Sequence, residues 1–198
     1  LESHLREIGM IEEEIKLIET KIAKVAKEDK KVKLLMSIPG VDFYSVVTIL
    51  YEIGDIKRFS DYKKLVAYAG LVPGVKQTNK TIIHGHITKE GPAILRWILT
   101  CDARTAVRCQ TGKLRRFYER VKKRRGEKKA IVAAAKKLLI IIYRMLIENK
   151  EYEERNDDTT YRKIKRMKAI AKGRLPMLNA RMKQLSRLGI KTLITEEN

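Results

Sequence analysis

Hydrophobic residues in the first part of the chain recur at alternating spacings of three and four positions. The positions are Ile8, Ile11, Ile15, Ile18, Ile22 and Val25. This spacing is typical of a coiled-coil seam, and it fails at Asp29, so it predicts a helical arm over residues 1–31. The seam is short. It can pack against a second copy of the chain, which we favour, or against another part of the same chain.

A Pro-Gly pair at residues 39–40 separates two apolar helical runs, 32–38 and 44–53. A helix, a glycine turn and a second helix form a helix-hairpin-helix, in which the first N–H groups of the second helix bind a phosphate. In that interpretation Gly40 allows close backbone approach and Val41 begins a set of amide donors. The alternative is an ordinary corner packed in the core, and the pattern does not decide between them.

The helical period returns at residues 60–70, where Ser60 is the expected N-cap, and disappears from 71 to 88. Such a stretch is long for a structureless loop in a compact domain, so it predicts a functional loop or a small β-hairpin. It is rich in hydroxyl, amide and cationic side chains suited to phosphate: Lys76, Gln77, Thr78, Asn79, Lys80, Thr81, His84 and His86.

Three further helices are predicted between residues 89 and 148. The first has an apolar face that includes Ile94 and Leu95 and a face that carries Arg96, Arg104 and Arg108. The second, from Gly112, leaves most of its arginines and lysines in solvent. The third, 128–148, is apolar on nearly all sides and is expected to be the central core helix.

The whole pattern predicts a mainly α fold. We expect a coiled-coil arm at 1–31, a helical domain at 32–150 that contains the helix-hairpin-helix and the basic loop or hairpin, and a helical extension at 151–198. The extension combines an acidic linker with a basic amphipathic segment and a further helix near 177–188. It is either a DNA-contacting arm, which its charge favours, or a docking helix for another subunit.

Charge changes this picture most between residues 57 and 129. The chain has a formal net charge of +20, and this segment alone contains 20 basic and 5 acidic residues, a net +15. A lysine-rich surface of the thermophilic type would carry a matching number of glutamates. The excess therefore predicts a polyanionic partner, nucleic acid.

The cysteines and the hydropathy of the sequence indicate the cellular environment of the protein. Cys101 and Cys109 fit neither a disulfide framework nor a zinc site, and no apolar stretch is long enough to span a bilayer. A reducing, cytoplasmic setting without a membrane partner is expected.

Motifs for nucleotide or metal chemistry are missing from the sequence. It contains no Walker loop, dinucleotide-binding glycines, zinc spacing or HExxH. The acidic residues of the basic segment are scattered over different predicted elements, so no metal site is predicted for this chain. A hydroxyl nucleophile in the 71–88 loop is the remaining route to cleavage of a phosphodiester.

Five short motifs occur in order along residues 37–97: Ser-Ile-Pro-Gly-Val at 37–41, Glu-Ile-Gly-Asp-Ile-Lys-Arg-Phe at 52–59, Ala-Tyr-Ala-Gly-Leu-Val-Pro at 67–73, His-Gly-His-Ile-Thr-Lys-Glu-Gly at 84–91 and Leu-Arg-Trp at 95–97. Together they resemble the C-terminal transposase domain of the bridge-RNA-guided insertion-sequence recombinases, relatives of the pilin-gene invertase. The resemblance covers roughly residues 32–150, with the upstream coiled coil also expected.

This resemblance implies half of a composite active site. In that family a RuvC-like N-terminal domain with a DEDD carboxylate set binds divalent metal, and a serine of the C-terminal domain attacks DNA. Here the RuvC-like part is absent, so Mg²⁺ is expected in a domain outside this sequence and the segment alone is expected to be inactive. Thr78 stands at the serine position and Thr81 is the backup. Threonine keeps the hydroxyl but adds a methyl group that stiffens the side chain.

The resulting hypothesis is a transposase domain that binds DNA, binds guide RNA as a further candidate partner, and self-associates through the coiled coil. The alternatives are a non-catalytic helix-hairpin-helix module for DNA or RNA, and a ribosome-associated basic protein. The candidate nucleic-acid-binding residues are Gly40, Val41, Lys76, Lys80, His84, His86, Lys89, Arg96, Arg104, Arg115, Arg116, Arg120, Lys123, Arg124 and Arg125.

Overall fold

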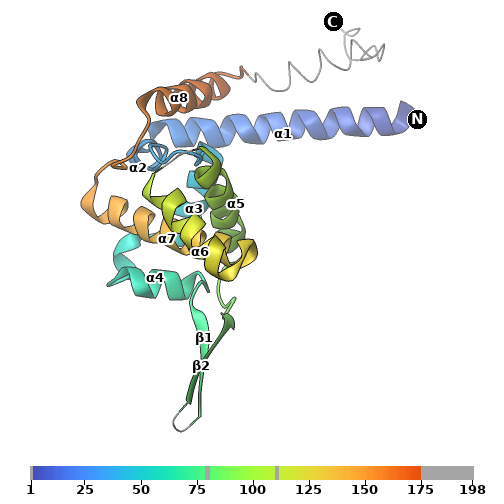
Figure 1. The fold of residues 1–198 in the computed structure, drawn as a ribbon. Helices are drawn as coiled ribbons and strands as arrows, with labels where there is room; N and C mark the ends of the chain where they lie inside the picture. Colours follow the sequence, from blue (N-terminus) through green and yellow to red (C-terminus); the bar gives the residue numbers. More distant parts are fainter. Residues whose placement is uncertain (1, 79–80, 110–111, 175–198) are drawn as a thin grey trace, which may run out of the picture. The chain divides into compact units, whose positions relative to one another are not determined.

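A computed structural model of the chain describes residues 2–78, 81–109 and 112–174, and this part is mainly helical (Figure 1). The predicted mainly α fold is confirmed. The elements are α1 (Glu2–Glu28), α2 (Lys30–Leu35), α3 (Phe43–Ile53), the 3-10 helix η1 (Ile56–Arg58), α4 (Tyr62–Tyr68), β1 (Pro73–Thr78), β2 (Thr81–Ile87), α5 (Ala93–Cys109), α6 (Lys113–Arg125), α7 (Glu127–Glu148) and α8 (Asp157–Ala171).

The chain divides into two compact units. One contains α1 and the end of α8 from residue 165 onward, and the other contains residues 29–164. The predicted domain boundaries at 31 and 150 stay predictions. The helix expected near 177–188 lies outside the described residues.

Helix α7 is the centre of the larger unit. It contacts α2, η1, α4, α5 and α6, and Ala130, Ala134, Leu138, Leu139 and Ile142 on it are fully buried. Burying one leucine or isoleucine contributes about 1.5–3 kcal/mol. The prediction of a central core helix over residues 128–148 is therefore confirmed.

Aspartates begin several of the short helices of the larger unit. The N-caps of α2, α3, η1 and α4 are Asp29, Asp42, Asp55 and Asp61, and each side chain accepts a hydrogen bond from a backbone N–H at the start of its helix. The expected cap Ser60 is therefore wrong by one residue, because Asp61 accepts from the Lys64 amide at 3.0 Å. One such cap contributes about 1 kcal/mol.

Helix α1 presents its predicted seam to solvent in the single chain. Ile8, Ile11, Ile15 and Ile18 are between 47% and 56% exposed, and Val25 is 71% exposed. Whether the seam pairs with a second copy stays a prediction. Among the described residues, no helix combines the length and apolar character that crossing a bilayer requires.

Candidate nucleic-acid interface

Strands β1 and β2 form the small β-hairpin that the sequence offered as one alternative. Strands β1 and β2 pair antiparallel, with Val75 opposite His84 and Thr78 opposite Thr81. The hairpin projects from the end of the larger unit where α4 and the start of α5 lie (Figure 1). The register brings the two threonine backbones together at the far end of the hairpin.

The base of the hairpin is tied to α4 and α5 through backbone groups. The Thr88 amide donates to the Val72 carbonyl at 2.9 Å. Gly70 and Gly91 have positive φ angles of 65° and 95°, and a Cβ on either would collide with backbone across the base. These two glycines allow the chain to enter and leave the hairpin at a fixed place on the helical unit.

Arg96 closes the same base. Its guanidinium donates to the Gly91 carbonyl at 2.9 Å and has longer contacts, 3.3–3.4 Å, with the carbonyls of Ala69, Glu90 and Pro92. The side chain is half-buried. This geometry makes Arg96 a structural tie between α5 and the hairpin, a role that differs from its predicted contact with phosphate.

The predicted nucleophile is described only by its backbone. Thr78 ends β1, and its side chain lies outside the described residues, as do the side chains of Lys76 and His84 and the whole of Lys80. His86 and Lys89, nearer the base, are exposed. The role of Thr78 in catalysis stays a prediction.

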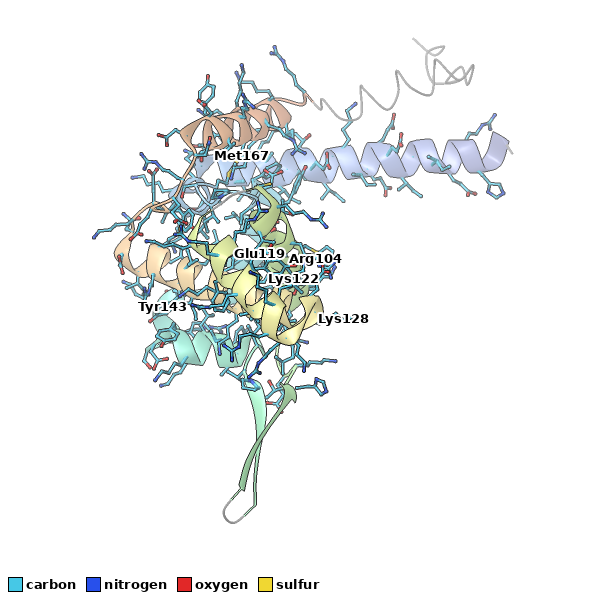
Figure 2. All side chains as sticks on the ribbon, in the orientation of Figure 1. Arg104, Glu119, Lys122, Lys128, Tyr143 and Met167 are labelled. Carbon is cyan, nitrogen blue, oxygen red and sulfur yellow. The ribbon has the colours of Figure 1, made fainter. Side chains whose placement is uncertain are left out.

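Helix α6 carries the densest positive charge. Eight of its 13 residues are Lys or Arg and one, Glu119, is acidic. The inward side is fixed by the buried Leu114 and Tyr118. Lys122 and Lys128, the latter on α7, are also exposed (Figure 2). The amphipathic pattern therefore directs the cations to solvent.

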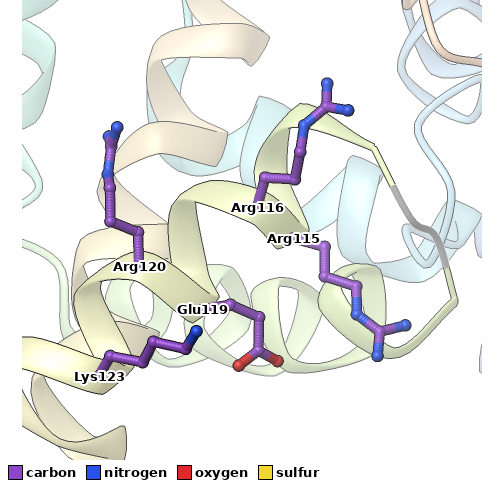
Figure 3. Close-up of a pocket in the computed structure, with 5 residues that line it drawn as sticks. All are labelled: Arg115, Arg116, Glu119, Arg120 and Lys123. Carbon is purple, nitrogen blue, oxygen red and sulfur yellow. The ribbon is translucent and has the colours of Figure 1, made fainter.

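A shallow depression of about 420 Å³ lies on this helix and is lined by Arg115, Arg116, Glu119, Arg120 and Lys123. Figure 3 shows Arg116 and Arg120 extending from one side of the helix and Arg115 and Lys123 from the other. Flexible cations around an open hollow suit the oxygens of a phosphate backbone, which are contacted without regard to sequence. Arg124 and Arg125 extend the exposed charge to the end of the helix.

The N-terminus of α6 already has an acidic partner. The Glu154 carboxylate accepts from the Lys113 amide at 2.7 Å and lies 3.9 Å from Arg116, while Glu153 pairs with the Lys113 ammonium at 2.7 Å. The positive end of the helix dipole is therefore occupied by the linker after α7. Phosphate binding is favoured further along the helix, at Arg120 and Lys123.

The turn between α2 and α3 is packed inside the larger unit. Gly40 has φ +85°, and a Cβ there would lie 2.6 Å from the Ala106 nitrogen on α5. The Val41 side chain is buried, and its amide donates to the Ile38 carbonyl at 3.3 Å. The close approach that Gly40 permits is thus to α5, which favours the alternative of a corner packed in the core.

Lys163 of α8 reaches into the same turn. Its ammonium donates to the carbonyls of Met36, Ile38 and Val41, the last two at 2.9 Å. Burial lowers the pKa of Lys163 to about 8, and the carboxylates of Asp42 and Asp102 oppose that shift. One cation thus binds three backbone carbonyls of the turn, of which Ile38 also accepts from the Val41 amide.

Asp102 is a buried carboxyl group on the core side of α5. Its Oδ1 accepts from the Ser45 hydroxyl at 2.7 Å, and its Oδ2 is buried without a hydrogen-bond partner. Burial raises the pKa of Asp102 to about 7, against the opposing effect of the Ser45 hydrogen bond. The group joins α3 to α5, so we assign it to the packing of the unit and not to a metal site.

Residues 32–119 match a family model described as Transposase IS116/IS110/IS902 family. This segment is similar to the transposases of that family. It contains the turn at Gly40, the β-hairpin, all of α5 and the first half of α6. The basic run from Arg120 to Arg125 lies just beyond the matched region.

Curated transposases are also similar to part of the chain. The chain is 35% identical over 102 residues to the transposase for insertion sequence element IS1111A of Coxiella burnetii, which covers 51% of this chain and 26% of that protein. It is 28% identical over 110 residues to a probable family 20 transposase of Pseudomonas aeruginosa, covering 52% and 32%. A putative transposase of Sinorhizobium fredii is 40% identical over 65 residues, covering 33% and 17%. The chain thus spans a third or less of the length of these relatives.

The chain also contains residues that its sequence pattern did not single out as functional. Trp97 is 64% exposed and lies beside Ile94, which is 55% exposed, although Ile94 was placed on the buried face by its spacing. Counting helical turns from the buried Leu95 and Leu99 would have placed Trp97 on the outer side. No local pattern signals Lys163, whose acceptors lie more than 120 residues away.

Proposed function

We propose that this chain is the DNA-binding part of an insertion-sequence transposase that cleaves and exchanges DNA strands. The cations of α6 carry the proposal, because Arg115, Arg120 and Lys123 surround an open hollow on a helix whose first half lies within the segment that matches a transposase family. Positive charge on one helix face, unbalanced by acidic side chains, tracks a phosphate backbone.

The binding test uses a fluorescently labelled DNA duplex and the whole chain. Affinity should fall linearly with the logarithm of salt concentration, and the slope should report the number of phosphates that are neutralised. An affinity that is independent of salt would contradict the proposal. A chain with no measurable affinity at low salt would contradict it equally.

The catalytic part of the proposal concerns Thr78. Its hydroxyl oxygen would lose its proton, attack a backbone phosphorus and form a Thr–O–P bond. The displaced deoxyribose oxygen would take up a proton and leave as a hydroxyl group, so the net change is the transfer of one proton from threonine to the leaving oxygen. Within the described part of the chain, no three His, Cys, Asp or Glu side chains lie close enough to hold a metal ion. The resemblance implies that Mg²⁺ would be bound by a RuvC-like domain outside this sequence.

The test of Thr78 needs a full-length transposase that contains this chain, with Mg²⁺ and guide RNA. A covalent protein–DNA adduct should form, disappear in Thr78→Ala and persist or increase in Thr78→Ser, because serine lacks the crowding methyl group. Thr105→Ala is the matched control, since that hydroxyl only donates to the Cys101 carbonyl of its own helix. An undiminished adduct in Thr78→Ala would remove Thr78 from the mechanism and leave a non-catalytic binding module as the better description.

The same proposal assigns α1 to self-association. Its exposed seam has the coiled-coil spacing, so a second copy would bury Ile11 and Ile15. Sedimentation of the chain should show an assembly that Ile11→Asp and Ile15→Asp together dissociate. A monomer at all concentrations would contradict this assignment. Guide RNA is proposed as a partner on the resemblance alone.

A further inference from the structure

The outer face of α5 combines apolar and cationic side chains. The buried face contains Leu95, Leu99, Ala103 and Ala106. On the opposite side, positions 97, 101, 104 and 108 follow one another at spacings of four, three and four, so they form one stripe along the helix. The stripe begins with Trp97 and ends with the exposed Arg104 and Arg108.

The apolar end of this stripe is larger than Trp97 alone. Ile94 lies one turn before Trp97 and is 55% exposed, and Tyr51 of α3 is 85% exposed. Gly40 lies against Ala106 and Ser45 binds Asp102, so α3 and α5 run antiparallel. Tyr51 is therefore at the level of Ile94 and Trp97 along the two helices.

The stripe has no exposed negative charge. Asp102 is the one acidic residue of α5, and it is buried on the core side at 4% exposure. A second copy of the chain that docked symmetrically on this face would bring Arg104 and Arg108 toward their own copies, which like-charge repulsion disfavours. The charge instead fits an anionic partner that also offers flat apolar surfaces.

We infer that Trp97 is a stacking platform for the unpaired bases of a nucleic acid strand. A base lies on the face of the indole ring, Ile94 extends the contact, and Arg104 and Arg108 hold the neighbouring phosphates. Paired bases in a duplex stack on each other and leave no face for Trp97. The inference deepens the proposed nucleic-acid function and rests on it: α6 binds backbone, whereas α5 selects single-stranded segments such as those opened during strand exchange.

Trp97 is the chain's only tryptophan, so its fluorescence reports this site alone. The whole chain is titrated with a labelled oligothymidine strand and with a duplex of equal length, and oligonucleotide anisotropy is followed together with tryptophan emission. The single strand should quench the emission in parallel with binding, and the duplex should not. Trp97→Ala should weaken single-strand affinity about tenfold and duplex affinity by less than about twofold.

Two further variants separate stacking from bulk. Trp97→Phe should recover part of the single-strand affinity and Trp97→Leu should not, because leucine is apolar but has no aromatic face. Tyr161→Ala is the matched control, since Tyr161 of α8 is an exposed aromatic residue of similar exposure, 66%, outside the stripe. It should leave both affinities unchanged.

The outcomes distinguish this inference from the proposed function. If neither oligonucleotide binds, both fail. If both bind while the emission is unchanged and Trp97→Ala binds like the wild type, the platform is refuted and the proposed function stands. If the emission changes with protein concentration in the absence of nucleic acid, and Trp97→Ala prevents that self-association, the face is a protein interface and the platform is likewise refuted.

Discussion

Helix α6 directs its polar groups to solvent, whereas the turn at residues 36–42 uses its polar groups inside the fold. On α6, Arg120 and Lys123 are exposed around an open hollow. In the turn, the carbonyls of Met36, Ile38 and Val41 are held by Lys163. Cationic side chains on an exposed helix face can contact a ligand. A backbone N–H or C=O group can bind a ligand only if no other group of the protein already forms a hydrogen bond with it.

The largest expected effect is at Gly40, where the turn packs against α5. A Gly40→Ala substitution should lower the free energy of unfolding by about 3 kcal/mol, because it adds left-handed backbone strain to a collision with α5. A Cβ there would lie 2.6 Å from the Ala106 nitrogen. Urea denaturation measures the loss.

Gly126 is the control for Gly40. It has a similar φ of +78° but no atom within 4 Å of a built Cβ. Its ψ of 168° lies in a backbone region that is almost restricted to glycine, so Gly126→Ala should show the strain alone, about 2 kcal/mol. Equal losses in the two variants would mean that Gly40 is not pressed against α5, and the turn would again be a candidate for phosphate.

Lys163→Met tests whether the turn depends on the Lys163 ammonium, and its expected effect on stability is smaller than that of Gly40→Ala. The variant keeps the apolar length of the side chain but leaves three carbonyls without their charged donor, so the free energy of unfolding should fall by about 2 kcal/mol. Lys165→Met, at an exposed position of the same helix, should change it by less than about 0.5 kcal/mol. If Lys163→Met is as stable as the wild type, the turn does not need α8.

The pH dependence of the Lys163 contribution has a definite sign. The folded pKa, about 8, lies below the ordinary value of 10.5. Between these pH values the unfolded chain binds more protons, so stability should rise with pH across that window. The rise should be smaller in Lys163→Met when both proteins are denatured in urea at pH 8 and pH 10.

Asp102→Asn tests a second buried ionisable group, whose effect on the pH dependence of stability is opposite to that of Lys163. The Asp102 pKa is raised from 3.8 to about 7, so the folded chain binds the extra proton and wild-type stability should fall as pH rises from about 4 through 7. Asparagine can still accept from Ser45 and cannot ionise. The variant should gain on the order of 2 kcal/mol over the wild type between pH 5 and pH 8.

Asp55→Asn is the control for this titration, because Asp55 is an exposed helix cap. It should follow the wild-type pH profile. If the Asp102→Asn profile also parallels the wild type, the buried carboxyl group stays charged. A cationic or hydrogen-bonding partner for Asp102 would then have to lie at the α3–α5 contact.

Sequence reasoning succeeded where structure depends on local pattern. The apolar pattern of residues 128–148 predicted the central helix α7, and the spacing of apolar residues in α6 predicted that its cations are exposed. The loss of helical period at 71–88 predicted a loop or a hairpin. It could not foresee contacts between distant residues. Glu154 occupies the start of α6 from 41 positions away, and Arg96 is turned to the Ala69 carbonyl across 27. Which amides and cations remain free for DNA depends on such contacts.

The smallest expected effect per residue is on α6, where the charges are independent and screened. Arg120→Ala and Lys123→Ala should each weaken binding of any DNA sequence to a similar degree and make the slope of log affinity against log salt shallower by about 0.9. Lys137→Ala, exposed on α7 and outside the hollow, is the control and should leave the slope unchanged. If all three variants shift the slope equally, the DNA follows the net charge of the chain and not the face of α6. If only the two α6 variants shift the slope, DNA binds at the exposed face of α6.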